Sequence, residues 1–238
     1  MTCRGGRFTA DPTTSSGINC SLSGGDNKPL EVELIVPRVP RSDQAKEKET
    51  RQSSPFKYLT TLHKLQELSI DPMDVVAGYW KEVASGDTYM AMELHLESQD
   101  RLLGRGSDSA LLNAIRSVES LYAAQNSGAV VERVSVREKI DNAVSGAGDV
   151  GAHILDAWPE LHKIGQLRRE VAHGKERPSA GFGIRCLGGA MALQWIQRCL
   201  LLTSLGISHT AARSIVLDNF QYRRDLKTLR YWNIELGG

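Results

Sequence analysis

The sequence predicts a mainly α-helical protein, an antiparallel bundle of helices preceded by a small α+β segment and a low-complexity N-terminus. Three observations lead to this fold class. Apolar residues recur at helical spacing over residues 108–231, glycine or proline separates the helical stretches, and residues 1–55 lack any such pattern. The 238 residues, 41% of them hydrophobic, are enough for one core of middling size or two small ones.

The N-terminal residues 1–55 are expected to be largely disordered. They are rich in Gly, Ser, Pro and charged residues, and such a composition buries too little apolar surface to offset the chain entropy. One exception is residues 30–36 (LEVELIV), whose alternation and β-branched side chains predict a single strand.

Residues 56–104 are expected to form a partial α+β domain. Leucines at helical spacing predict a short helix over residues 56–68, and Asp71-Pro72 predicts the start of a second one. Residues 90–96 alternate between apolar and polar, which predicts a half-buried strand that could pair with residues 30–36.

The third region, residues 105–232, is expected to be the helical bundle. Its predicted helices span about residues 108–125, 133–145, 153–173, 184–205 and 209–231. Pro159 stands where the start of a helix favours proline, and Gly206 is expected to end the fourth helix. Short joints between these helices favour an antiparallel arrangement.

Composition excludes several classes of protein. No stretch approaches the roughly 18–20 apolar residues that a membrane span needs, so no membrane partner is expected. The four cysteines (Cys3, Cys20, Cys186 and Cys199) form neither a zinc pattern nor a disulfide framework, which favours the cytoplasm, and the last two are expected in the core. Phosphate-binding and dinucleotide-binding glycine motifs are absent, and no metal or cofactor is expected.

The net charge of +1 hides a polarity along the chain. Residues 87–160 sum to −6 (six Lys/Arg against twelve Asp/Glu), whereas residues 161–238 sum to +7 (twelve against five). A basic last third can attract a polyanion if the charges share a face, or it can simply pair with the acidic middle.

The densest polar cluster, residues 167–175 (LRREVAHGK), has the spacing of a known signature. An Arg, four residues and a His, here Arg168 and His173, resemble the motif of HEPN domains, which are all-helical bundles. Residues 112–122 and 136–140 resemble the first two bundle helices of the ApeA-like HEPN group, which acts in anti-phage abortive infection. Residues 72–98 resemble the end of the domain that precedes that bundle.

This resemblance implies a metal-independent endoribonuclease with its site at a homodimer interface. The chemistry of the residues is consistent with that activity. Attack by the RNA 2′-hydroxyl needs proton transfer, which a histidine such as His173 can provide near neutral pH. Arg168 offers an always-charged fork for the phosphate oxygens, and the reaction would be confined to RNA.

Further residues are candidates around this pair. Glu119 either faces the motif and holds Arg168 or is a helix surface charge. Arg169, Lys175 and Arg177 are expected to contact phosphates, or are simply solvated. Arg223 and Arg224 belong to a C-terminal run of basic and aromatic residues that suits stacking on unpaired bases. The alternative for that run is an amphipathic helix that packs Phe220, Leu226, Leu229 and Trp232 onto the bundle.

Other functions remain open. His173 could merely cap its helix, where a cationic side chain interacts well with the helix dipole. Arg169 stands where the family most often has Asn, Asp or His, which favours a non-catalytic module that binds RNA, nucleotides or proteins. A third alternative is a toxin held inactive by an antitoxin, so an antitoxin or a phage-derived trigger is a candidate partner beside RNA.

Overall fold

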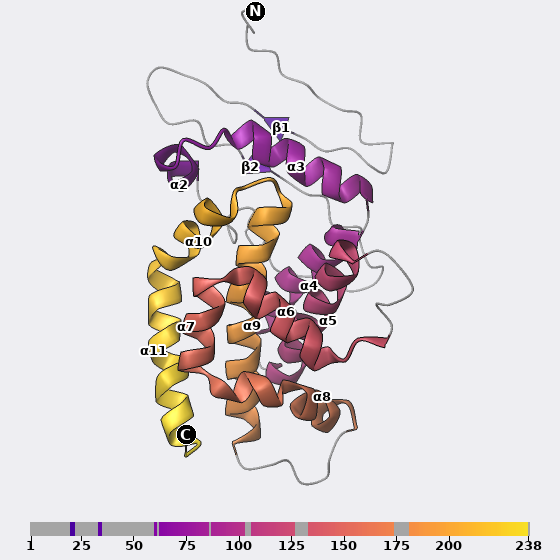
Figure 1. The fold of residues 1–238 in the computed structure, drawn as a ribbon, viewed down its shortest axis with the longest axis vertical. Helices are drawn as coiled ribbons and strands as arrows, with labels where there is room; N and C mark the ends of the chain where they lie inside the picture. Colours follow the sequence, from indigo (N-terminus) through magenta and orange to yellow (C-terminus); the bar gives the residue numbers. More distant parts are fainter. Residues whose placement is uncertain are drawn as a thin grey trace, which may run out of the picture. The chain divides into compact units, whose positions relative to one another are not determined.

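The structure is a computed structural model, and it separates into two units, Met1–Leu65 and Gln66–Gly238. Figure 1 shows the helices of the second unit as coiled ribbons. The residues that the structure describes are 20–21, 33–34, 60, 62–85, 87–102, 106–126, 133–173 and 181–237. Most of the predicted low-complexity N-terminus therefore lies outside the described residues.

The N-terminal unit contains two short strands, β1 (Cys20–Ser21) and β2 (Glu33–Leu34). They pair in antiparallel fashion, with Cys20 opposite Leu34. β2 lies within the strand predicted at residues 30–36, but its partner is β1 and not residues 90–96. Helix α2 (Leu62–Glu67) is shorter than the predicted helix over residues 56–68, of which residues 56–59 lie outside the described part.

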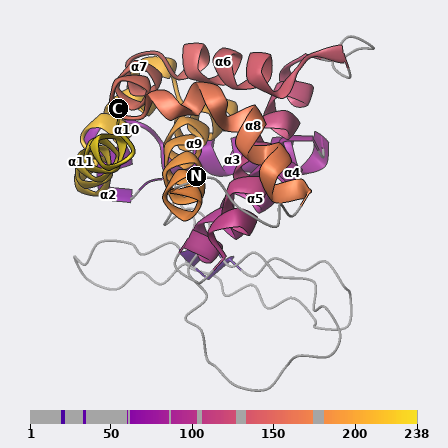
Figure 2. The same cartoon turned by 90° about the horizontal axis from the view of Figure 1, so that it is seen from below.

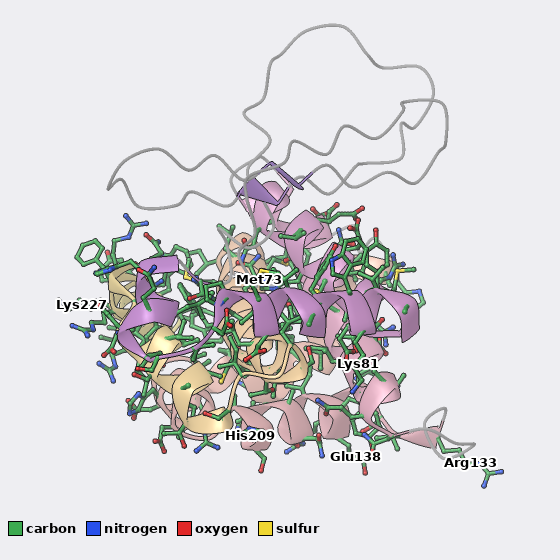
Figure 3. All side chains as sticks on the ribbon, turned by 90° about the horizontal axis from the view of Figure 1, so that it is seen from above. Met73, Lys81, Arg133, Glu138, His209 and Lys227 are labelled. Atoms are coloured by element: carbon green, nitrogen blue, oxygen red, sulfur yellow. The ribbon has the colours of Figure 1, made fainter. Side chains whose placement is uncertain are left out.

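Helix α3 (Pro72–Ser85) begins where the sequence predicts. The carboxylate of Asp71 accepts a hydrogen bond of 2.8 Å from the backbone N–H of Met73, which satisfies one of the free donors at the helix start. Val75 and Tyr79, four residues apart, are buried on one side of α3. Figure 3 shows α3 crossing the view, with Met73 and Lys81 labelled.

The strand predicted at residues 90–96 is wrong, because these residues lie inside the helix α4 (Asp87–Leu102). The alternation of apolar residues is accidental, since Met90 is 54% exposed. Burial instead follows the helical repeat of three and four residues, at Thr88, Ala91, Met92, His95 and Ser98. Methionine, leucine and glutamate, which are frequent in this segment, also favour helix over strand.

Three further helices agree with the predicted ranges to within three residues. They are α5 (Ser107–Gln125), α6 (Val136–Ala147) and α9 (Phe182–Ser204). Helix α9 is buried on nearly all sides because α4, α5, α6, α7, α10 and α11 pack around it. The second unit is thus a mainly α-helical bundle, as predicted.

Two long predicted helices are broken. The stretch at 153–173 consists of α7 (Asp149–Ala157), a 3-10 turn η2 (Pro159–Lys163) and α8 (Ile164–Ala172). Pro159 begins η2, as its position predicts, and its ring disfavours helical geometry at Trp158.

The stretch at 209–231 consists of α10 (His209–Leu217) and α11 (Phe220–Glu235). Asn219 separates them, because its side chain caps α11 by accepting hydrogen bonds from the N–H groups of Gln221 (2.8 Å) and Tyr222 (3.3 Å).

A polar layer crosses the core between α4, α5 and α9. The imidazole of His95 lies 2.8 Å from the amide oxygen of Gln197 and 3.0 Å from the amide nitrogen of Gln99. Gln197 also donates to the carbonyl of Ala114 on α5. Both ring nitrogens are thus satisfied in the neutral form, and burial lowers the pKa of His95 to about 4.

Cys186 and Cys199 behave as core residues, as predicted. Cys186 is 0% and Cys199 is 1% exposed, and neither is in a disulfide. Burial raises the pKa of Cys186 to about 12 and that of Cys199 to about 11. Both thiols are therefore poor nucleophiles.

Candidate functional site

Helix α8 carries the predicted motif and is held on the bundle by its apolar side. Ile164 and Leu167 are buried, and α8 packs against α5, α6 and α9. Arg168 follows Leu167 directly, so its side chain leaves the helix at the edge of this contact and is 36% exposed. The guanidinium is therefore close to the core and still reachable from solvent.

The structure pairs Arg168 with Glu119 of α5. The Arg168 Nη2 atom donates a hydrogen bond of 3.2 Å to Oε2 of Glu119. The sequence left open whether Glu119 faces the motif or solvent, and this contact shows that it faces the motif. The Glu119 side chain is only 22% exposed, so solvent screens the pair less than it screens a surface ion pair.

A third residue at this place, Lys139 of α6, is one that the sequence analysis missed. Its Nζ atom lies 4.0 Å from the other carboxylate oxygen of Glu119, and its side chain is 11% exposed. The signal was present, since Lys139 lies three residues after Val136 and next to the buried Ile140, on the apolar side of α6. A charged residue in such a position usually has a buried partner.

His173 ends α8 and is exposed to solvent. Its backbone N–H bonds to the carbonyls of Arg169 (3.0 Å) and Val171, and its dihedral angles (φ −99°, ψ 3°) leave the helical range. The imidazole is therefore at the C-terminal end of α8 and accessible to a ligand. This position also suits the simple capping role that the sequence left open.

The remaining predicted residues fall in three places. Arg169 is exposed on α8, beside Arg168. Lys175 and Arg177 lie outside the described residues. Arg223 and Arg224 are exposed on α11, which lies on the opposite side of α9 from α8 in both views (Figures 1 and 2). The structure thus joins Glu119 to Arg168 and keeps the two α11 arginines apart from them.

A shallow pocket lies between η2, α8 and α9. Its charged walls are already paired: the Arg185 Nε atom is 3.5 Å from Glu160, and Gln166 donates a hydrogen bond of 3.3 Å to the buried Glu170. Lys163 also contacts Glu160. The charged groups that line this pocket thus contact one another within the pocket wall.

The described residues contain no candidate for a membrane span or for a metal site. None of their helices is long and apolar enough to cross a membrane. They also hold no cluster of three or more His, Cys, Asp or Glu side chains that could bind a metal ion.

Comparisons of the sequence with protein-family models and with curated proteins, and of the fold with solved structures, give no match. The chemistry of this site therefore has to be inferred from its own residues. These are Glu119, Lys139, Arg168, Arg169 and His173, contributed by α5, α6 and α8.

Proposed function

We propose that the chain is a metal-independent endoribonuclease of the HEPN type, with Arg168 and His173 as its catalytic residues. The observation that supports this most is the hydrogen bond between Arg168 and Glu119. It fixes a partly exposed guanidinium on the same short helix that ends in the exposed His173. An oriented cation beside a titratable imidazole is what cleavage of a phosphodiester requires.

The positive charge at this place exceeds the negative charge. Arg168 and Lys139 share the single carboxylate of Glu119. Arg169, next to Arg168 on α8, adds a third cation. Glu119 occupies one nitrogen of the Arg168 fork. The remaining N–H groups can donate to the oxygens of a phosphate.

In the proposed reaction the 2′-hydroxyl attacks the adjacent phosphorus atom, and the bond from phosphorus to the departing 5′-oxygen breaks. A neutral imidazole accepts the 2′-hydroxyl proton, and a protonated imidazole supplies a proton to the 5′-oxygen. Arg168 stabilises the charge that gathers on the phosphate oxygens. The products are a 2′,3′-cyclic phosphate and a 5′-hydroxyl, so proton balance is kept without a metal ion.

A homodimer would complete this site. Two positions five residues apart on an α-helix are separated by about 140° around the helix axis. Arg168 and His173 therefore leave α8 in different directions. A two-fold axis beside α8 would bring two Arg168 and two His173 side chains into one cleft. One protomer could then supply the base and its partner the acid.

The proposed substrate is single-stranded or loop RNA, because its bases and 2′-hydroxyls are accessible. The proposed setting is anti-phage defence by abortive infection, in the cytoplasm, with a phage-derived trigger or an antitoxin as controlling partner. This setting is supported by the resemblance of residues 112–122 and 136–140 to the ApeA-like group, beside the HEPN-like motif in residues 167–175.

Arg169 supports a second candidate function, a non-catalytic RNA-binding or nucleotide-binding module. Arg169 is exposed directly after Arg168, where a shorter polar side chain would be expected in an active site of this type. An additional cation there strengthens phosphate binding and does not itself transfer protons.

The test is an RNA cleavage assay with tRNA and unstructured RNA in excess chelator. The parent chain is compared with His173→Ala and with His153→Ala, which removes another exposed histidine, from α7. We expect cleavage by the parent and His153→Ala, and a loss of at least a hundredfold in His173→Ala. If all three proteins bind RNA and none cleaves it, the proposed nuclease is contradicted and the binding module becomes the assigned function.

A further inference from the structure

We propose that the outward face of α11 is a docking surface for single-stranded RNA, separate from the site on α8. We call it the α11 face and define it by the apolar residues Phe220, Tyr231 and Ile234, of which the first two are aromatic, and by the cations Arg223, Arg224, Lys227 and Arg230. The inference takes its ligand class, RNA, from the proposed function and adds a second place on the molecule that binds it.

The α11 face exposes large apolar side chains. Phe220 is 78% exposed, Tyr231 is 60% exposed and Ile234 is 69% exposed. The amphipathic packing considered from the sequence is therefore wrong for Phe220, which points away from the bundle. Leu229 is buried as that alternative requires. Single exposed apolar residues need no explanation, but three on one helix face mark a candidate interaction surface.

The opposite side of α11 is fixed to the bundle by polar contacts. The buried carboxylate of Asp225 accepts a hydrogen bond of 3.1 Å from the indole of Trp195 on α9, and Gln221 donates one of 2.7 Å to its other oxygen. The Tyr222 hydroxyl reaches the carbonyl of Val150 on α7 at 3.4 Å. These contacts set the rotation of α11 and so determine which residues face solvent.

Helical geometry places the aromatic and basic residues of the α11 face in one line. Phe220 and Tyr231 are eleven residues apart, which is about three turns and about 16 Å along the axis. Arg224 and Lys227 follow Phe220 by four and seven residues, so they lie between the two rings on the same side. Figure 3 shows Lys227 on the outer side of α11.

The charges of the α11 face are available to a polyanion. Within the described residues, Lys227 has no carboxylate within 4.0 Å. Arg223 pairs with Asp218 at 3.6 Å, and Arg230 pairs with Asp156 at 2.9 Å, both at the margins of the face. Arg224 lies 3.8 Å from the carboxylate of its neighbour Asp225, and its side chain is 62% exposed. Such exposed ion pairs contribute little to stability, so a phosphate can replace the carboxylates as the partner of these cations.

The alternation of ring and cation favours single-stranded RNA over a lipid surface. An interfacial helix keeps its cations beside its apolar stripe, whereas Arg224 and Lys227 stand between the two rings. Unpaired bases stack on aromatic side chains while their phosphates contact neighbouring cations. A duplex hides its bases, so it would gain only the charge contacts.

The C-terminal end of α11 lies near the beginning of α9. A Cβ atom added to Gly181 would come within 2.2 Å of the Leu236 side chain, just beyond α11. The α11 face therefore ends beside the start of α9 and is a surface separate from the site on α8.

The test measures RNA binding without cleavage, in a His173→Ala background and excess chelator. Fluorescence anisotropy gives the Kd of a labelled unstructured RNA of 20 nucleotides for two double variants, Phe220→Ala/Tyr231→Ala and Arg224→Ala/Lys227→Ala. The controls remove exposed apolar and exposed basic residues elsewhere, Met73→Ala/Met90→Ala and Arg133→Ala/Arg137→Ala. Circular dichroism checks that all five proteins are folded.

We expect each α11 double variant to weaken binding of the single strand by about tenfold or more, and each control by less than twofold. Removing the two cations should also reduce the slope of log Kd against log salt by about 1.4, because single strands release about 0.7 counterions per contact. A duplex of the same length should lose affinity only in the cationic variant.

Unchanged RNA affinity in both α11 variants, or no RNA binding by the His173→Ala parent, would overturn this inference. Binding to phosphatidylserine vesicles is measured for the same proteins. If the α11 variants lose vesicle binding while their RNA affinity is unchanged, the inference is also overturned and the face is assigned to a membrane. Failure of the proposed function gives a different result, namely no cleavage by the parent in the nuclease assay while RNA binding through α11 persists.

Discussion

Arg168 on α8 and Glu119 on α5, 49 positions apart in the sequence, are joined by a hydrogen bond of 3.2 Å. Lys139 on α6 approaches the other oxygen of the same carboxylate at 4.0 Å. One carboxylate thus connects three helices and balances two cations, the partly exposed Arg168 and the nearly buried Lys139. This arrangement gives Glu119 both a structural role and a positioning role for Arg168.

Replacing Glu119 with Gln should lower the free energy of unfolding by about 1–3 kcal/mol, because Lys139 and Arg168 would then lack a counter-charge. RNA cleavage should fall by at least tenfold, since Arg168 would no longer be oriented. Urea unfolding and the cleavage assay measure the two effects. Asp141→Asn, which removes an exposed carboxylate from α6, is the control and should stay within about 0.5 kcal/mol of the parent.

A double variant separates the two roles of Glu119. Adding Lys139→Met to Glu119→Gln should recover part of the lost stability, because the nearly buried ammonium is gone. Cleavage should not recover, because Arg168 still lacks its partner. Recovery of activity together with stability would contradict the positioning role.

His95 should make the stability of the protein sensitive to acid. Its folded-state pKa of about 4 lies below the ordinary value of 6.5, so the unfolded state binds more protons between these pH values. The contribution of His95 to the free energy of unfolding is complete above about pH 6.5. It is lost as the pH falls toward 4, by about 3 kcal/mol in total. Urea unfolding of the parent and of His95→Gln at pH 7 and pH 4.5 separates the contribution of His95 to the free energy of unfolding from that of the carboxylates. A stability difference between the two proteins that does not change with pH would contradict this prediction.

Two glycines should respond in opposite directions to alanine. In α7, a Cβ atom on Gly151 would lie 2.1 Å from the backbone oxygen of Val144, so Gly151→Ala should force the contact with α6 apart. In α8, nothing lies within 4 Å of a Cβ atom on Gly165, so Gly165→Ala should stabilise the helix by about 0.5–1 kcal/mol. Thermal unfolding should therefore give a lower Tm for the first variant and a higher one for the second. Equal shifts would show that the approach of α7 to α6 is looser than described.

Asn219→Ala should cost about 1 kcal/mol, because the Asn219 side chain satisfies two N–H groups at the start of α11. Asn219→Asp, which keeps an acceptor in the same place, should restore most of that stability. Urea unfolding of the three proteins measures the cap directly. Equal stability of Asn219→Ala and the parent would mean that packing, and not the cap, defines the start of α11.

Much of the helical architecture could be predicted from the sequence, because its signal is local. The apolar stripe of α5 and the continuous apolar sequence of α9 each extend over five or more turns, so the limits of both helices were found within two residues. Helix α4 was missed because its inner face uses small and polar residues, such as Ala91, His95 and Ser98, which a hydrophobic pattern does not count. The break before α11 was missed because apolar spacing continues across Asn219, where only a cap marks the boundary.

The candidate site could be predicted only where its residues share a helix. Arg168 and His173 were found from a spacing on one segment, whereas the pairing of Glu119 with Arg168 needed the packing of α5 on α8. The position of Lys139 on the apolar side of α6 indicates a paired charge, but no local rule connects residues 119, 139 and 168. Long-range electrostatic pairing is set by tertiary structure and leaves a weak trace in one sequence.

The most direct test of the proposed nuclease is the chemistry of the ends that it produces. Purified protein is incubated in excess chelator with an unstructured RNA and with the same sequence carrying 2′-O-methyl groups, and the products are identified by mass spectrometry. The account predicts fragments with 2′,3′-cyclic phosphate ends from the RNA and none from the methylated strand, with no cleavage by His173→Ala. Products with 3′-hydroxyl ends, cleavage of the methylated strand, or an intact RNA after incubation with the folded parent would contradict it.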